Sequence, residues 1–156
     1  MNLAAVTSYA EQARARKMTD ATAVGIDDAL ISRLVEKFYE RVQDDKLLGP
    51  IFTAHVADWA PHLAQMKDFW ASVTLESGRF NGSPMAKHVA IGGLEQIHFD
   101  RWLTLWHKTV GEIAPNDAAA EVFRSAAQRI ASSLLTGIQV HRGGLAAISP
   151  RAAAAS

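Results

Sequence analysis

Residues 59–89 read WAPHLAQMKDFWASVTLESGRFNGSPMAKHV, and this stretch holds two histidines in different settings. Its first half predicts a helix from about Asp58 to Glu76, with Pro61 in the first turn, where proline is tolerated. Apolar residues recur along it with the helical period. The predicted apolar face consists of Trp59, His62, Leu63, Met66, Phe69, Trp70 and Val73. His62 is its one polar member, although a lone histidine on such a face is more often a core residue than a ligand.

The second half of the stretch places His88 on a short turn of helix. Residues 77–83 are rich in glycine, serine and asparagine and predict a loop. Ser83 then supplies an N-cap and Pro84 the first helical position, while Gly92-Gly93 ends the turn. A histidine on such an isolated turn adds little to a core, so a functional role is weighed here against simple surface exposure.

The remaining sequence predicts helices and no strand. A helix beginning near Asp27 carries Tyr39 on its apolar face, and a helix over about residues 94–113 carries Trp102. The last helix is expected to run to about Val140. Between the first two long helices, the apolar segment LLGPIF predicts a tight corner that turns Phe52 inward. The pattern is that of an all-α domain with about four principal helices in two layers.

The length of the chain is that of one domain, and its composition excludes several classes of function. The 156 residues divide into an N-terminal extension (1–26) with a short helix, a helical domain (27–141) and a flexible tail (142–156). Sixteen basic and sixteen acidic residues balance, so no nucleic-acid partner is expected. The absence of cysteine excludes disulfides, thiolate catalysis and iron–sulfur clusters. No apolar run is long enough to span a membrane and no secretory signal is evident, which predicts a cytoplasmic protein.

Three of the apolar faces each present one residue able to form a hydrogen bond, namely Tyr39, His62 and Trp102, and His88 lies on a separate turn. Iron in a porphyrin needs one axial imidazole, an apolar slot and few polar groups on the other side of the ring. A zinc site formed by His62, His88 and His98 is a weaker interpretation, because the spacings match no zinc motif. The alternative from another class is a haem-free helical interaction or sensor domain, in which these residues belong to the core.

Four segments carry a family resemblance: FYERVQDDKLLGPIF (38–52), DWAPHLAQMKDFW (58–70), GSPMAKHV (82–89) and HFDRWLTLW (98–106). Over about residues 27–140 they resemble the truncated haemoglobins, most closely group III. The resemblance implies a shortened globin, with two antiparallel helix pairs stacked two-over-two around haem b.

The resemblance also implies roles for individual residues. His88 matches the proximal iron ligand of the family. On the distal side, Tyr39, His62 and Trp102 match residues of the ligand pocket, and Phe52 matches a phenylalanine packed on the haem. Further cofactor contacts are expected from Leu63, Met66, Phe69 and Trp70, with Lys87 and Arg79 as candidates for the haem propionates.

The expected chemistry is binding of diatomic gases. We expect His88 to bind iron through Nε2 while its Nδ1–H bonds a backbone carbonyl. Tyr39 and Trp102 would donate hydrogen bonds to O₂ and slow its release, which favours sensing, or NO or peroxide chemistry, over O₂ transport. His62 is either a gate near the ligand or a sixth iron ligand. An NO dioxygenase or peroxidase-like activity would need a separate reductase, because the sequence holds no flavin or nicotinamide motif.

Overall fold

The computed structural model describes residues 3–80 and 82–148, and within them every regular element is an α-helix. The predicted all-α class is therefore confirmed. In chain order the helices are α1 (Leu3–Ala23), α2 (Asp28–Asp44), α3 (Gly49–His55), α4 (Trp59–Leu75), α5 (Pro84–Ile91), α6 (Gln96–Ile113) and α7 (Asp117–Ile148).

Short polar side chains set the starts of four helices. The Asp27 carboxylate accepts the Leu30 N–H at 2.8 Å at the start of α2. Asp58 and Ser83 do the same for α4 and α5, and the Asn116 side chain accepts an N–H of the first turn of α7 at 2.8 Å. Each such bond satisfies a backbone donor that a helix terminus would otherwise leave unpaired. The starts predicted for α2, α4 and α5 are confirmed.

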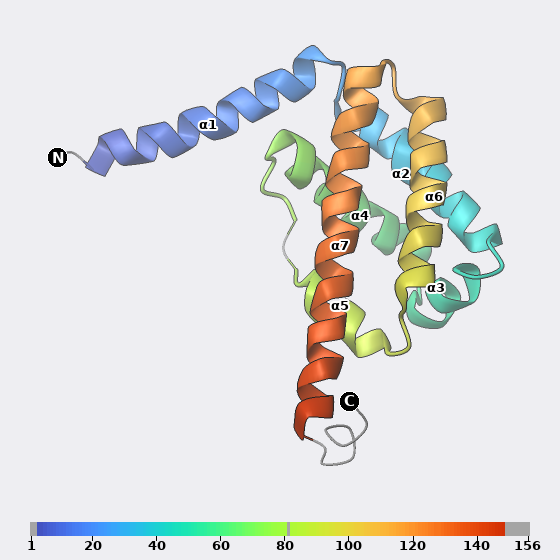
Figure 1. Cartoon of the computed structure of the whole chain (residues 1–156). Coiled ribbons are helices and arrows are strands. Elements are labelled where there is room, and N and C mark those ends of the chain that lie inside the picture. Colours follow the sequence, from blue (N-terminus) through green and yellow to red (C-terminus); the bar gives the residue numbers. More distant parts are fainter. Residues whose placement is uncertain (1–2, 81, 149–156) are drawn as a thin grey trace.

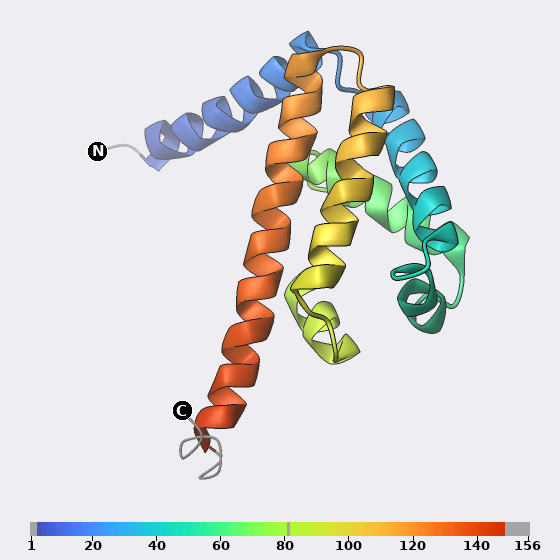
Figure 2. The same cartoon turned by 45° about the vertical axis from the view of Figure 1, so that its right-hand side comes forward.

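The body of the protein consists of two helix pairs. Helix α2 packs against α4 and α6, and α7 packs against α6 and α4, with α6 and α7 running antiparallel (Figures 1 and 2). Fully buried Phe38, Trp106 and Phe123 join these helices at the centre. The Trp106 indole N–H donates to the Phe123 carbonyl at 3.1 Å, which satisfies the one polar atom of that buried side chain. The arrangement is the expected two-over-two sandwich.

Both ends of the chain are more helical than the sequence predicted. Helix α1 reaches Ala23 instead of Lys17 and extends away from the body (Figure 1). Residues 9–20 are exposed along it, and contact with the body comes from buried Ala21 and an ion pair between Lys17 and Glu76 at 2.9 Å.

Helix α7 continues to Ile148, past the expected end at Val140 and into the segment predicted as a flexible tail from residue 142. The Arg142 guanidinium donates to the Leu94 carbonyl at 2.6 Å and fastens this part of α7 to the segment after α5. The rest of the predicted tail, residues 149–156, lies outside the described residues. No helix in the described ranges is long and apolar enough to cross a bilayer.

Candidate functional site

A cavity of about 440 Å³ lies among α2 to α7, within the size range of cofactor sites. Apolar and aromatic side chains form most of its wall, as is usual for such sites. Nine of the residues singled out in the sequence line it: Tyr39, Phe52, His62, Met66, Phe69, Trp70, Lys87, His88 and Trp102. The fold thus brings together side chains from five helices, α2 to α6, at one cavity.

His88 lies on α5, partly buried, and faces the cavity. Its Nδ1 is 2.6 Å from the Pro84 carbonyl oxygen, which can only accept, so Nδ1 carries the proton and donates. In a neutral ring the lone pair is then on Nε2. A backbone hydrogen bond to one ring nitrogen is the usual way in which a metal-binding histidine is oriented through the other.

Tyr39 is almost completely buried in α2, at 5% exposure. Its ring meets the edge of His62 at 5.0 Å and of Phe52 at 5.7 Å between centroids. Burial raises the pKa of the Tyr39 hydroxyl well above its ordinary range, so the group keeps its proton. No hydrogen bond joins this hydroxyl to another described residue, and it is a donor free to act in the cavity.

His62 also faces the cavity from α4. Its Nε2 is buried and lacks a hydrogen-bond partner among the described residues. Burial, and then the positive charge of Lys87, lower the pKa of the His62 ring, so the neutral form is favoured. An unpaired buried nitrogen is uncommon in folded proteins and marks a position where a ligand can supply the partner.

Trp102 contributes the third polar group, from α6. Its ring lies parallel to that of Trp106 at 6.0 Å and meets the edge of Phe38 at 5.7 Å, so its orientation is fixed by packing. The buried Trp106 indole is paired with a carbonyl, as described above, whereas the Trp102 N–H has no acceptor among the described residues. Trp102 therefore has an indole donor available at the cavity.

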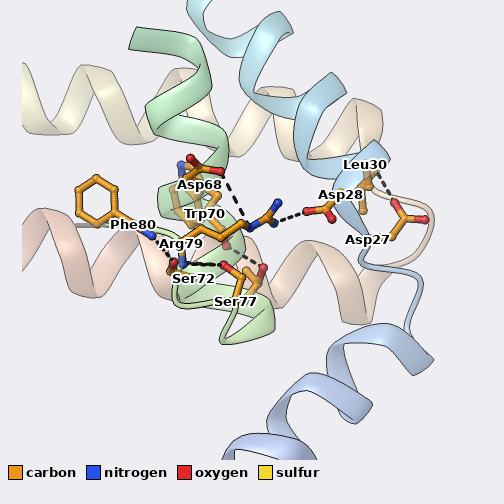
Figure 3. Close-up of polar contacts among 10 residues, drawn as sticks. Asp27, Asp28, Leu30, Asp68, Trp70, Ser72, Ser77, Arg79 and Phe80 are labelled. Atoms are coloured by element: carbon orange, nitrogen blue, oxygen red, sulfur yellow. Dashed lines mark hydrogen bonds and ion pairs between the residues drawn. The ribbon is translucent and has the colours of Figure 1, made fainter. Parts of the chain in front are cut away.

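Two of the predicted cofactor contacts lie elsewhere. Leu63 packs against the main core and is absent from the cavity wall. Arg79 also lies away from the wall, because its guanidinium donates to Asp28 at 2.6 Å and is 3.9 Å from Asp68 (Figure 3). The interpretation of Arg79 as a propionate partner therefore loses its geometric basis, while exposed Lys87 lies at the cavity.

Several wall residues were not among the predicted cofactor contacts, and one of them, His98, had been considered only for the alternative zinc site. His55 and His98 face the cavity, the first with Nδ1 donating to the Ile51 carbonyl at 2.8 Å, the second with Nδ1 accepting the Glu95 N–H at 3.0 Å. The second bond belongs to a capping box, which the Glu-x-x-His spacing could have revealed. Within the described ranges no three histidine or acidic side chains lie close enough to hold a metal ion, so the three-histidine zinc site has no support.

Comparisons with known proteins agree with this geometry. The family model of the bacterial-like globins matches residues 20–135. A group 3 truncated haemoglobin of Campylobacter jejuni is 37% identical over 111 residues, covering 69% of this chain and 87% of that protein. The crystal structure of group III truncated haemoglobin from Campylobacter jejuni matches with a TM-score of 0.68 and 35% identity, covering 72% of this chain and 91% of that one. The chain therefore belongs to the bacterial-like globins, a haem-binding family, and within it to the group III truncated haemoglobins.

Proposed function

We propose that this protein holds haem b through Nε2 of His88 and binds diatomic gases beside Tyr39, His62 and Trp102. The observation that carries the proposal is the hydrogen bond from His88 Nδ1 to the Pro84 carbonyl at 2.6 Å. In the neutral ring it leaves the lone pair on Nε2, on a side chain that faces the same cavity as the other three.

The residues present fit the cofactor. Haem is a flat apolar ring with two carboxylates and an iron atom that accepts imidazole. Phe52, Met66, Phe69 and Trp70 supply an apolar wall. Lys87, which is exposed and adjoins the cavity, supplies a cation for a carboxylate. The unpaired Nε2 of His62 further supports a ligand in this space, because such an atom costs free energy until it finds a partner.

When bound, ferrous haem supplies a coordination position that takes O₂, CO or NO. The chain's own contribution is a pair of donors held in place by packing, the Tyr39 O–H and the Trp102 N–H. Donors already oriented toward a ligand with partial negative charge stabilise it with little reorganisation. Hydrogen bonds to charged acceptors are worth about 1.5–3 kcal/mol each, so two of them would slow O₂ escape by orders of magnitude.

Slow release does not suit an O₂ shuttle. It favours sensing, or redox chemistry on NO or peroxide of the kind expected from an NO dioxygenase or a peroxidase-like enzyme. Such turnover consumes electrons, and the sequence has no motif for a flavin or nicotinamide. The electron donor is therefore expected to be a separate reductase.

An absorption spectrum of the purified protein tests the proposal directly. We expect a strong Soret band that shifts on addition of CO, and loss of stable haem binding in His88→Ala. A control variant, Phe80→Leu, alters the wall without touching the imidazole and should retain haem. A wild-type protein that does not bind added haemin would instead support the haem-free interaction or sensor domain.

A further inference from the structure

Helix α5, which carries His88, has no buried residue and depends on a few contacts for its position. One face of α5 presents Pro84, Lys87 and His88 to the cavity. The adjoining face presents Met85 and Val89, which are partly buried. These two side chains, together with that of Ile91, pack against a small cluster formed by Leu94, Phe99, Ala131, Leu134 and Ile138.

The cluster belongs largely to α7, which lies beside α5 in both views of the fold (Figures 1 and 2). Gly137 of α7 makes room for Met85: a β-carbon at Gly137 would overlap the sulfur and terminal methyl of that side chain. Glycine in the interior of a helix is less favourable than alanine. At Gly143, further along α7, a β-carbon would meet no atom of another described residue within 4 Å, apart from its chain neighbours and the nearby backbone of its own helix.

The ends of α5 are attached in other ways. At the start, the Ser83 hydroxyl accepts the Ala86 N–H at 3.5 Å, a long bond. After the helix, Gly92 and Gly93 adopt positive φ angles of 69° and 71° with open space around both. Neither attachment sets how far the middle of the helix approaches α7. That distance depends on the apolar contacts of Met85, Val89 and Ile91, and among these Met85 is the side chain that lies directly against Gly137.

We propose that the Met85 side chain, seated at Gly137, is the positioning contact that sets where α5 presents His88 to the cavity. This inference rests on the proposed function, in which His88 is the iron ligand. Met85 precedes His88 by three residues, so the two side chains lie about one turn apart on neighbouring faces of one short helix. The part of any displacement that the flexible end of the Met85 side chain does not absorb moves the backbone of α5 and reaches the imidazole through a single turn of helix.

Two alanine variants of α7 separate this role from helix stability. Gly137→Ala displaces Met85, whereas the matched control Gly143→Ala adds a methyl to open space, and both changes favour helix formation alike. The readouts are the iron–histidine stretching frequency of the ferrous protein, by resonance Raman spectroscopy, and the rate of haem transfer to an excess of another apo-globin. We expect Gly137→Ala to shift the frequency and speed haem loss about fivefold, or about 1 kcal/mol, with Gly143→Ala equal to the wild type.

A second pair of variants approaches the contact from α5. Met85→Ala alone should speed haem loss, because α5 loses one of its few apolar contacts. In the Gly137→Ala background, Met85→Ala removes the overlap, so it should speed haem loss by a smaller factor than it does in the otherwise wild-type protein. Strict additivity of the two changes would overturn the proposal.

The remaining outcomes distinguish this inference from the proposed function. If the wild type shows an iron–histidine band, and Gly137→Ala changes neither the frequency of this band nor the rate of haem loss, the positioning role is refuted. Haem binding by His88 would stand. A wild-type protein without that band would refute the proposed function and this inference with it.

Discussion

Replacing Tyr39 by phenylalanine removes one hydroxyl from the cavity and leaves the ring in its packing. The ring stays wedged against His62 and Phe52, and the hydroxyl gives up no hydrogen bond to a described residue. At neutral pH this hydroxyl is protonated, because burial raises its pKa. A hydrogen bond to an acceptor with partial charge contributes a free energy at the lower end of the range for charged acceptors, about 1.5–2 kcal/mol. Each 1.36 kcal/mol is a factor of ten in rate, so O₂ dissociation should accelerate about tenfold to thirtyfold.

Stopped-flow replacement of O₂ by CO measures that rate, and Trp102→Phe should change it in the same direction. CO dissociation is the control, because CO carries little charge and gains little from a donor. Because Tyr39 has no partner to lose, Tyr39→Phe should leave the free energy of unfolding unchanged or raise it by up to about 1 kcal/mol. An O₂ dissociation rate equal to that of the wild type would show that the hydroxyl does not bond the ligand, and a large change for CO would point to altered access instead.

Lys87→Ala should raise the pKa of His62. Burial is the larger cause of the lowered pKa of this ring and the positive charge of Lys87 is the second, so removal of the charge reverses part of the shift. An NMR titration of the His62 ring protons measures the change. Asp45→Asn should lower stability at pH 7 by about 1–2 kcal/mol. Burial acts to raise the pKa of Asp45, but hydrogen bonds from Arg101 and backbone N–H groups outweigh it and hold the pKa below its ordinary 3.8. The carboxylate therefore stabilises the fold above that value and loses this effect as the pH falls toward the folded pKa, so urea unfolding should show a weaker acid dependence in the variant. Removal of residues 1–17 deletes the exposed residues 9–17 of α1 and one exposed ion pair, and should lower Tm by no more than about 4 °C in calorimetry.

The elements that sequence analysis placed best are those whose signals are local. Asp27 and Ser83 act within three residues of themselves, so a sequence pattern contains both partners of the cap. The ends of helices were predicted less well, because they depend on distant contacts. Helix α7 runs past Val140 with the help of Arg142, whose acceptor is a carbonyl 48 residues earlier in the chain.

The predicted cofactor contacts also depend on residues far away in the sequence. Lys87 and Arg79 carry the same charge and both precede His88 by fewer than ten residues, so the sequence made both candidates for the haem propionates. The structure separates them because Asp28, 51 residues away, binds the Arg79 guanidinium at the surface (Figure 3). The sequence did not predict that α7 contributes to the cavity wall, although Ile130 and Leu134 line it. Apolar residues in a helical pattern are found in a core and in a cofactor pocket alike, so the pattern does not distinguish the two.

His62 is the residue whose two candidate roles, gate or sixth ligand, the sequence left open, and the structure shows what both require. Burial and the nearby Lys87 favour the neutral ring, which is the form able to ligate iron and also able to donate or accept one hydrogen bond. Its buried Nε2 has no partner in the described part of the chain, and such an atom costs about 1–3 kcal/mol. A histidine with a purely structural role recovers none of that free energy, whereas either role at the cofactor does. His107 Nε2 is also buried without a partner in the described part of the chain and lies away from the cavity wall, so the cost alone does not locate a ligand. The argument for His62 is that its ring is at the cavity wall, where its contact with Tyr39 at 5.0 Å puts a bound partner within reach of the proposed donor.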